Sequence, residues 1–118
     1  MKRALLIFFI VFIIMQFIQP NKENTTVDKN LEIKAPLEVM NILKTSCFDC
    51  HSNEVKYPWY SDIAPFSWVV ANHVNTGRKA LNFSIWENYS PEKKEEKLKE
   101  IFRTAYASMP LPSYLYLH

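Results

Sequence analysis

The only two cysteines of the chain lie three positions apart and are followed at once by a histidine, in Cys47-Phe48-Asp49-Cys50-His51. Each thiol of such a pair can add to one haem vinyl group, and the neighbouring imidazole can then bind the iron as its proximal ligand. The spacing matters because one short stretch must make both thioether bonds and the iron bond. The motif therefore predicts one covalently attached haem c, held by Cys47, Cys50 and His51.

The cysteine pair has three other possible interpretations. A disulfide or redox-active dithiol normally begins a helix in a strand-rich, thioredoxin-like setting, which this sequence lacks. A structural zinc site needs four ligands, and only His73 and His118 could complete the set, neither at a usual spacing. The third interpretation is a chance match on a structural turn. We expect haem in preference to all three.

The first twenty residues differ in composition from the rest of the chain. Met1-Lys2-Arg3 is a short basic head, and an almost unbroken apolar run follows from Ala4 to Ile18. A cleaved signal peptide needs small residues at its cleavage site, which residues 16–20 lack, and a core helix would not be apolar all round. We therefore expect residues 1–20 to be an uncleaved signal-anchor helix in the cytoplasmic membrane, touching lipid through residues 4–18. The positive head would place the following domain on the periplasmic side, as a single-pass protein.

Charge and glycine content exclude two classes of partner. Two of the fourteen Lys and Arg residues lie in the basic head, so residues 21–118 carry twelve basic and twelve acidic side chains. A balanced domain has no electrostatic field for binding nucleic acid. Gly77 is the only glycine, so no glycine-rich loop can surround the phosphates of a nucleotide. We expect neither nucleic acid nor nucleotide as a partner.

Beyond residue 20 the sequence predicts a small all-α, cytochrome c-like domain with long ordered loops. Residues 21–34 are polar, carry no periodic apolar face and should form a spacer, so the haem-binding domain occupies residues 35–118. The spacing of apolar residues predicts one helix from Pro36 to Cys47 and another from Pro65 to Lys79, where Gly77 marks the end.

A third helix has the clearest boundaries. Ser90 should be its N-cap and Pro91 its first residue. Its apolar stripe consists of Leu98, Ile101, Phe102, Ala105 and Tyr106. The proline-rich stretch 109–113 cannot be helical and should form a stiff loop. The tryptophans are expected to line the haem or fill the core; they are Trp59, Trp68 and Trp86.

The second axial ligand of the iron has to come from elsewhere in the chain. Met109 begins a proline-flanked loop similar to the methionine loops of small cytochromes c, and prolines reduce the cost of ordering such a loop. The alternative is a methionine packed in the core, as we expect for Met40. His73 is the runner-up ligand because it faces inward on its helix, and His118 is terminal. We expect Met109 to be the distal ligand.

Several longer motifs in one order resemble the haem-binding domain family of Bacteroidetes and related bacteria. They are the stretches 47–54 around the cysteine–histidine motif, Tyr-Pro-Trp-Tyr at 57–60, Ala-Pro-Phe-Ser-Trp at 64–68, Leu-Asn-Phe-Ser-Ile-Trp at 81–86 and Met-Pro-Leu-Pro-Ser-Tyr at 109–114. The resemblance covers residues 21–118 and the segment before them, and it implies haem binding through the cysteine–histidine motif. Family members usually continue past His118 with a proline and an amphipathic helix, so we expect this chain to lack that C-terminal helix.

Two classes of function follow from a haem on this chain. With both axial positions filled, the domain would be an electron carrier and not an enzyme. It would pass one electron at a time to a redox partner protein in the membrane or periplasm, at the outer face of the cytoplasmic membrane. With an open axial position, it would be a peroxidase-like enzyme or a gas sensor. We expect the carrier, because a sensor needs an output module that 118 residues leave no room for.

Overall fold

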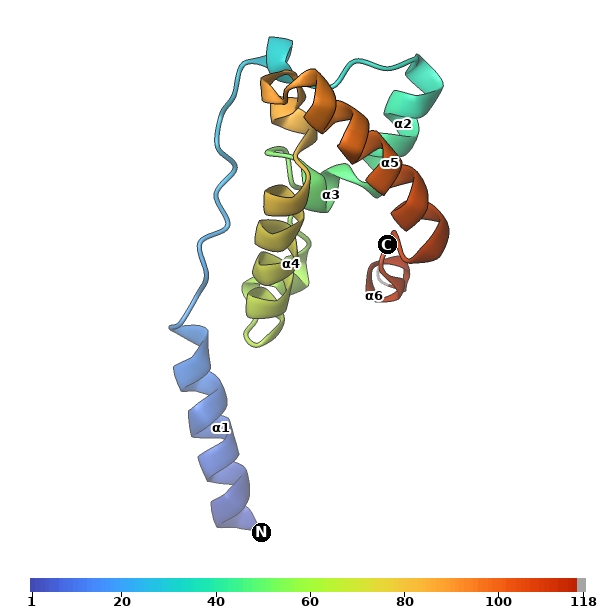
Figure 1. Ribbon diagram of the computed structural model, residues 1–118. Helices are drawn as coiled ribbons and strands as arrows, with labels where there is room; N and C mark the ends of the chain where they lie inside the picture. The colour runs from blue at the N-terminus through green and yellow to red at the C-terminus, as the bar shows by residue number, and fades with distance from the viewer. Residues whose placement is uncertain (117–118) are drawn as a thin grey trace.

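The computed structural model describes residues 1–116, which form helices and no strand. His118, weighed above as an iron ligand, lies outside the described residues. The longer helices are α1 (Lys2–Gln16), α2 (Leu37–Ser46), α4 (Phe66–Ala80) and α5 (Pro91–Ala107). The shorter ones are α3 (Phe48–His51), α6 (Pro112–Leu115) and the 3-10 helices η1 (Lys29–Leu31), η2 (Trp59–Asp62) and η3 (Phe83–Asn88). Figure 1 shows α1 extending away from the other helices, which gather around α3.

Helix α1 is shorter than the predicted membrane helix. It has fifteen residues and therefore a length of about 22 Å, against roughly 30 Å of hydrocarbon in a bilayer. It ends at Gln16, whose side-chain amide accepts a hydrogen bond from the Ala64 N–H at 2.9 Å and donates one to the Ala64 carbonyl at 3.2 Å. Across residues 1–116, no helix has the length and apolar character that a membrane crossing requires. The predictions of an N-terminal membrane helix over residues 1–20 and of a single-pass location in the cytoplasmic membrane are therefore wrong, and the periplasmic placement that depended on them is withdrawn.

The segment that follows α1 is hydrogen-bonded to the domain. We call residues 18–25 the N-terminal strap, which runs as an extended thread beside α4 (Figure 1). The indole N–H of Trp68 donates to the Ile18 carbonyl at 2.6 Å, and Lys22 donates to the Ser61 carbonyl at 2.9 Å. Asn24 exchanges two hydrogen bonds with the backbone of Val55, at 3.0 and 3.2 Å. Because these contacts are polar, the spacing of apolar residues in the sequence could not predict them.

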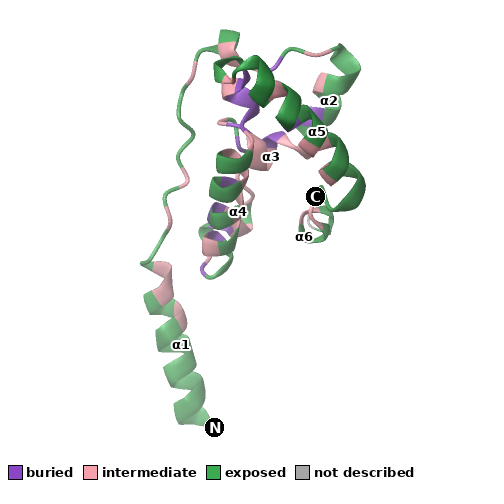
Figure 2. Ribbon diagram, in the orientation of Figure 1, coloured by how far each residue is buried: buried purple, intermediate pink, exposed green. Residues whose placement is uncertain are grey.

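The core is small and aromatic. Its buried members are Ile33, Leu43, Phe48, Phe83 and Trp86. The rings of Phe48 and Phe83 stack with centroids 5.5 Å apart, and Trp86 lies next to Phe83 at 6.4 Å. Of the three tryptophans, only Trp86 is in this core; Trp68 is half-buried and Trp59 is 77% exposed. Figure 2 shows the buried residues gathered near α3 and along α4.

Helix α5 begins as expected but buries little of its apolar stripe. Ser90 caps it, accepting a hydrogen bond from the Lys93 N–H at 3.3 Å, and Pro91 is its first residue. Ile101 packs against the core, whereas Phe102 is 80% and Tyr106 is 94% exposed. Most of α5 is accordingly drawn as exposed in Figure 2.

Two details near helix ends differ from the sequence-based expectation. Helix α4 ends at Ala80, one residue after the predicted Lys79, so Gly77 lies inside the helix and does not mark its end. The stretch expected to be a non-helical loop includes the start of α6, with Pro112 as its first residue. Proline is accepted at that position because the first N–H groups of a helix have no partner within it.

Candidate functional site

The cysteine–histidine motif forms its own turn of helix directly after α2. Cys47 ends α2 and begins α3, with φ −123° and ψ −36°, so the two helices meet at a bend. The Cys47 carbonyl accepts hydrogen bonds from the backbone N–H groups of Cys50 at 3.2 Å and His51 at 2.9 Å. One helical turn therefore carries both sulfur atoms and the imidazole, as attachment of a single group at three points requires.

Both cysteines are unpaired and half-buried. Burial raises the pKa of the Cys47 thiol. Burial also raises the pKa of the Cys50 thiol, with a further contribution from the Asp49 carboxylate. A redox-active dithiol depends on a lowered thiol pKa, so this environment argues against that interpretation. Within residues 1–116, no three His, Cys, Asp or Glu side chains gather into a metal-ion site of the zinc type.

His51 is oriented by the C-terminal end of α4. Its Nδ1 lies 3.0 Å from the Gly77 carbonyl and 3.0 Å from the Leu81 carbonyl. Carbonyl oxygens only accept hydrogen bonds, so Nδ1 must carry the ring hydrogen, and Nε2 keeps a lone pair for a metal. The Phe83 ring meets the imidazole edge-on, with centroids 6.3 Å apart. This tautomer and fixed ring orientation are what an iron ligand needs, and the residues present therefore fit a haem.

Gly77 explains how α4 comes close enough to hold His51. A Cβ atom at this position would lie 2.4 Å from the carbonyl oxygen of Cys50. Real Cβ atoms do not approach backbone oxygen this closely, so only glycine lets the two helices cross here. The single glycine of the chain therefore serves a close backbone approach and does not end a helix. A lone glycine inside a helical pattern was the available signal for this role.

The residues just after His51 attach the motif to η3. Ser52 Oγ donates to the Phe48 carbonyl at 2.6 Å and so closes the end of α3. The Asn53 N–H donates to Ser84 Oγ at 2.9 Å, and the Asn53 side-chain oxygen accepts from Asn82 at 2.7 Å. Ser52 and Ser84 are buried. Sequence reasoning did not assign Asn53, Asn82 and Ser84 a role, because hydrogen-bond partners 29 and 31 positions apart leave no local pattern.

Arg78 links the motif to the N-terminal strap. Its Nε donates to the Ser52 carbonyl at 2.7 Å. Its two terminal nitrogens donate to the Glu23 carbonyl at 3.0 Å and to the Asn24 side-chain oxygen at 2.6 Å. The planar guanidinium can satisfy three acceptors at once, so one side chain of α4 joins the backbone after His51 to a segment near the start of the chain.

The C-terminal segment, residues 109–116, returns to the same motif. The Tyr114 hydroxyl lies 2.9 Å from the Asp49 carboxylate and 3.3 Å from the Thr45 carbonyl. Burial raises the pKa of Tyr114, and the Asp49 carboxylate raises it further, so the phenol stays protonated and donates. Met109, five residues earlier, is 40% exposed, and its backbone N–H donates to the Thr104 carbonyl at 2.8 Å at the end of α5.

The runner-up ligand, His73, lies on the neighbouring helix. It is half-buried on α4, one turn before Gly77 and therefore on the same side of the helix. The structure thus places Cys47, Cys50 and His51 on one turn and His73 on the helix that crosses it.

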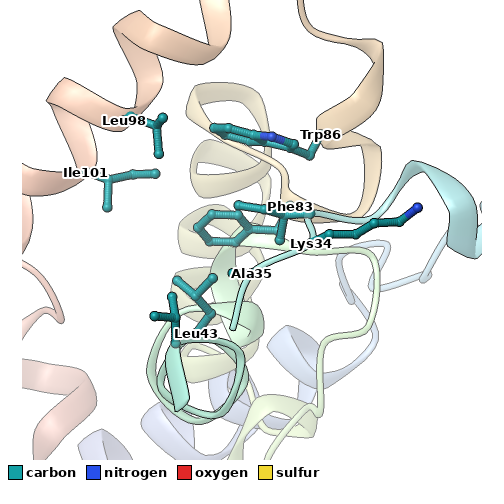
Figure 3. A pocket seen from close by; sticks show the side chains of 9 residues that line it. Lys34, Ala35, Leu43, Phe83, Trp86, Leu98 and Ile101 are labelled. Carbon is teal, nitrogen blue, oxygen red and sulfur yellow. The ribbon is translucent and has the colours of Figure 1, made fainter. Parts of the chain in front are cut away.

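An apolar cavity of about 260 Å³ lies beside the aromatic core (Figure 3). Leu98 and Ile101 of α5 face Phe83 and Trp86 of η3 across it, and Lys34 lies at its edge. Phe83 also contacts the motif, but none of the lining residues belongs to the motif itself. We therefore distinguish this cavity from the candidate site.

Comparison with known proteins gives one match. A family model described as a haem-binding domain matches residues 10–118, which include the cysteine–histidine motif, α4 with its crossing at Gly77, and the C-terminal segment. No curated protein and no solved structure matches the chain. The match covers most of the sequence, and the imidazole it includes is held as an iron ligand would be. The chain therefore belongs to the haem-binding domain family and binds haem.

Proposed function

We propose that the chain carries one haem c, joined to Cys47 and Cys50 by thioether bonds, and that it serves one-electron transfer to a redox partner protein. The observation that carries this proposal is the position of the His51 Nδ1 between the carbonyls of Gly77 and Leu81. When bound, haem supplies an iron that alternates between the ferric and ferrous states. Every other requirement falls on the side chains of this protein.

His51 is the proposed proximal ligand through Nε2. The two carbonyls hold the ring in one tautomer and increase the basicity of the ligand nitrogen. Gly77 makes this arrangement possible, since it allows the end of α4 to lie against α3. The half-buried thiols of Cys47 and Cys50 flank this ring on the same helical turn, at the spacing needed for two thioether bonds.

Met109 is the proposed distal ligand. A methionine that only packs in a core would be buried, whereas Met109 is 40% exposed in a segment that returns to the motif. A thioether is a soft, neutral ligand that favours ferrous iron over ferric iron. With two axial ligands from the protein, small molecules are kept from the iron, and electron exchange remains as the function.

The optical spectrum tests this coordination. The full chain, produced with haem-attachment machinery, should show in its ferric state the weak far-red absorption of a sulfur–iron bond. Met109→Ala should abolish this band and allow cyanide to bind, while Met15→Ala in α1 should change neither property.

Of two other outcomes, the first would contradict ligation by Met109 and the second would contradict the carrier. If the band is absent and His73→Ala alters the spectrum, His73 is the distal ligand and the potential should be lower. If neither substitution matters and cyanide binds freely to the unsubstituted protein, the iron is open, and an enzyme or sensor replaces the carrier.

A further inference from the structure

The C-terminal segment is held to the cysteine–histidine motif by a polar contact, and it buries little apolar surface. Leu115 is 62% exposed and Tyr116 is 89% exposed, so these side chains do not anchor α6. Tyr114 is half-buried, and its hydroxyl lies 2.9 Å from a carboxylate oxygen of Asp49, 65 positions away in sequence. Asp49 is one of the two residues between the cysteines of the motif.

We propose that Tyr114 is a positioning residue for Met109, and that its hydrogen bond to Asp49 controls how readily an outside ligand replaces the methionine at the iron. This inference rests on the proposed function, because it takes Met109 to be the distal ligand. It adds a regulator of that site, with the Asp49 carboxylate as the fixed point of contact.

The chain between Met109 and Tyr114 explains how Tyr114 can influence the position of Met109. Met109 and Tyr114 are separated by four residues, and Pro110 and Pro112 are two of them. Each proline fixes one backbone dihedral, so the position of Tyr114 restricts the positions that Met109 can reach. A freely moving segment would have to lose this freedom each time the sulfur bound the iron.

The contact is also stronger than an ordinary surface hydrogen bond. Its acceptor is a carboxylate, and charge-assisted hydrogen bonds are shorter and roughly twice as strong as neutral ones. The Thr45 carbonyl, at 3.3 Å from the same hydroxyl, adds a second acceptor from the end of α2. Tyr114 therefore joins α6 to both helices that meet at Cys47.

A matched pair of tyrosines, one in α6 and one at its C-cap, tests the inference. In the haem-loaded full chain, Tyr114→Phe removes only the hydroxyl that meets Asp49, and Tyr116→Phe removes an exposed hydroxyl as the control. We expect Tyr114→Phe to weaken the far-red band and raise the cyanide affinity roughly tenfold, as expected for the loss of one hydrogen bond to a charged group. Tyr116→Phe should leave both properties unchanged.

Two further measurements guard against a folding defect in Tyr114→Phe. One substitutes the hydrogen-bond acceptor, Asp49, and the other needs no cyanide. Asp49→Ala should raise cyanide affinity too, and adding Tyr114→Phe to it should have a smaller effect than Tyr114→Phe alone. Backbone hydrogen exchange in residues 109–116 should quicken in Tyr114→Phe and not in Tyr116→Phe.

The possible outcomes distinguish a failure of the proposed role of Tyr114 from a failure of the proposed ligation by Met109. If the unsubstituted protein shows the far-red band, but Tyr114→Phe matches Tyr116→Phe in band, affinity and exchange, the inference fails and the carrier stands. If the unsubstituted protein shows no such band, ligation by Met109 is wrong and the inference falls with it.

Discussion

The region around His51 and the C-terminal segment are held in place by different means. Around His51, the ring nitrogen and the backbone of the next two residues are bonded to α4 and η3, and Arg78 links this backbone to the N-terminal strap. The C-terminal segment contributes Met109, which is 40% exposed, and reaches the motif through Tyr114. The first region is held by several hydrogen bonds to other elements, whereas the second reaches the motif through one side chain.

If His51 and Met109 are the two iron ligands, as proposed, this difference suits their two roles. A proximal ligand beside two covalent bonds can be fixed permanently, because it never has to leave. A distal ligand decides whether outside molecules reach the iron. A small change in the contacts that position this ligand therefore changes function. Substitutions around His51 should therefore cost stability, and substitutions near the C-terminal segment should alter ligand binding instead.

The largest expected loss of stability comes from Gly77→Ala. The added Cβ would lie 2.4 Å from the Cys50 carbonyl oxygen, which is backbone and cannot move aside without separating α3 from α4. We expect the free energy of unfolding to fall by about 2–3 kcal/mol, the upper part of the range for overpacking. Urea denaturation of the purified chain measures this, with the exposed neighbour Thr76→Ala as the control. Equal midpoints for the two variants would show that α4 does not need this close crossing.

Arg78→Ala should have the second-largest effect. It removes hydrogen bonds to the carbonyls of Ser52 and Glu23 and to the Asn24 side chain. We expect a loss of about 1–3 kcal/mol, because a buried acceptor is left without its partner. Arg78→Lys should recover only part of this loss, since an ammonium cannot match the planar geometry of three acceptors.

The exposed neighbour Lys79→Ala serves as the control for Arg78 in the same urea titration. A further readout is limited proteolysis, which should cut the N-terminal strap faster in Arg78→Ala than in either Lys79→Ala or the unsubstituted protein. If the strap is cut no faster, Arg78 does not hold it to the motif.

The smallest expected effect on stability comes from Phe102→Ala on α5. The side chain is 80% exposed, and substitutions at such positions usually change the free energy of unfolding by less than about 0.5 kcal/mol. The same titration measures it. A loss of several kcal/mol would mean that α5 buries this ring in solution.

The residues of the candidate site could be picked out from the sequence more readily than the contacts that support them. The motif from Cys47 to His51 and the cap at Ser90 are local patterns, and local patterns survive in a sequence. The roles of Gly77 and Arg78 depend on what crosses them, which only the folded chain determines. No spacing rule connects residues so far apart.

The prediction of a membrane helix from the apolar N-terminal run was wrong for a related reason. Its composition resembles that of a membrane helix, but composition does not fix where a helix ends. The helix stops at Gln16, whose amide is paired with the backbone of Ala64, 48 positions later. Polar contacts of this kind also hold the N-terminal strap, which a reading of apolar periodicity could only describe as a spacer.

The intact mass of the denatured protein tests the central claim most directly. After production with haem-attachment machinery, unfolding and acid–acetone extraction, the full chain should retain the mass of one haem. The variant that combines Cys47→Ala with Cys50→Ala should lose it, while Ser46→Ala, next to the motif, should keep it. If the unsubstituted chain has its bare mass and the haem appears in the extract, the haem is not covalently attached, and the account of Cys47 and Cys50 is wrong.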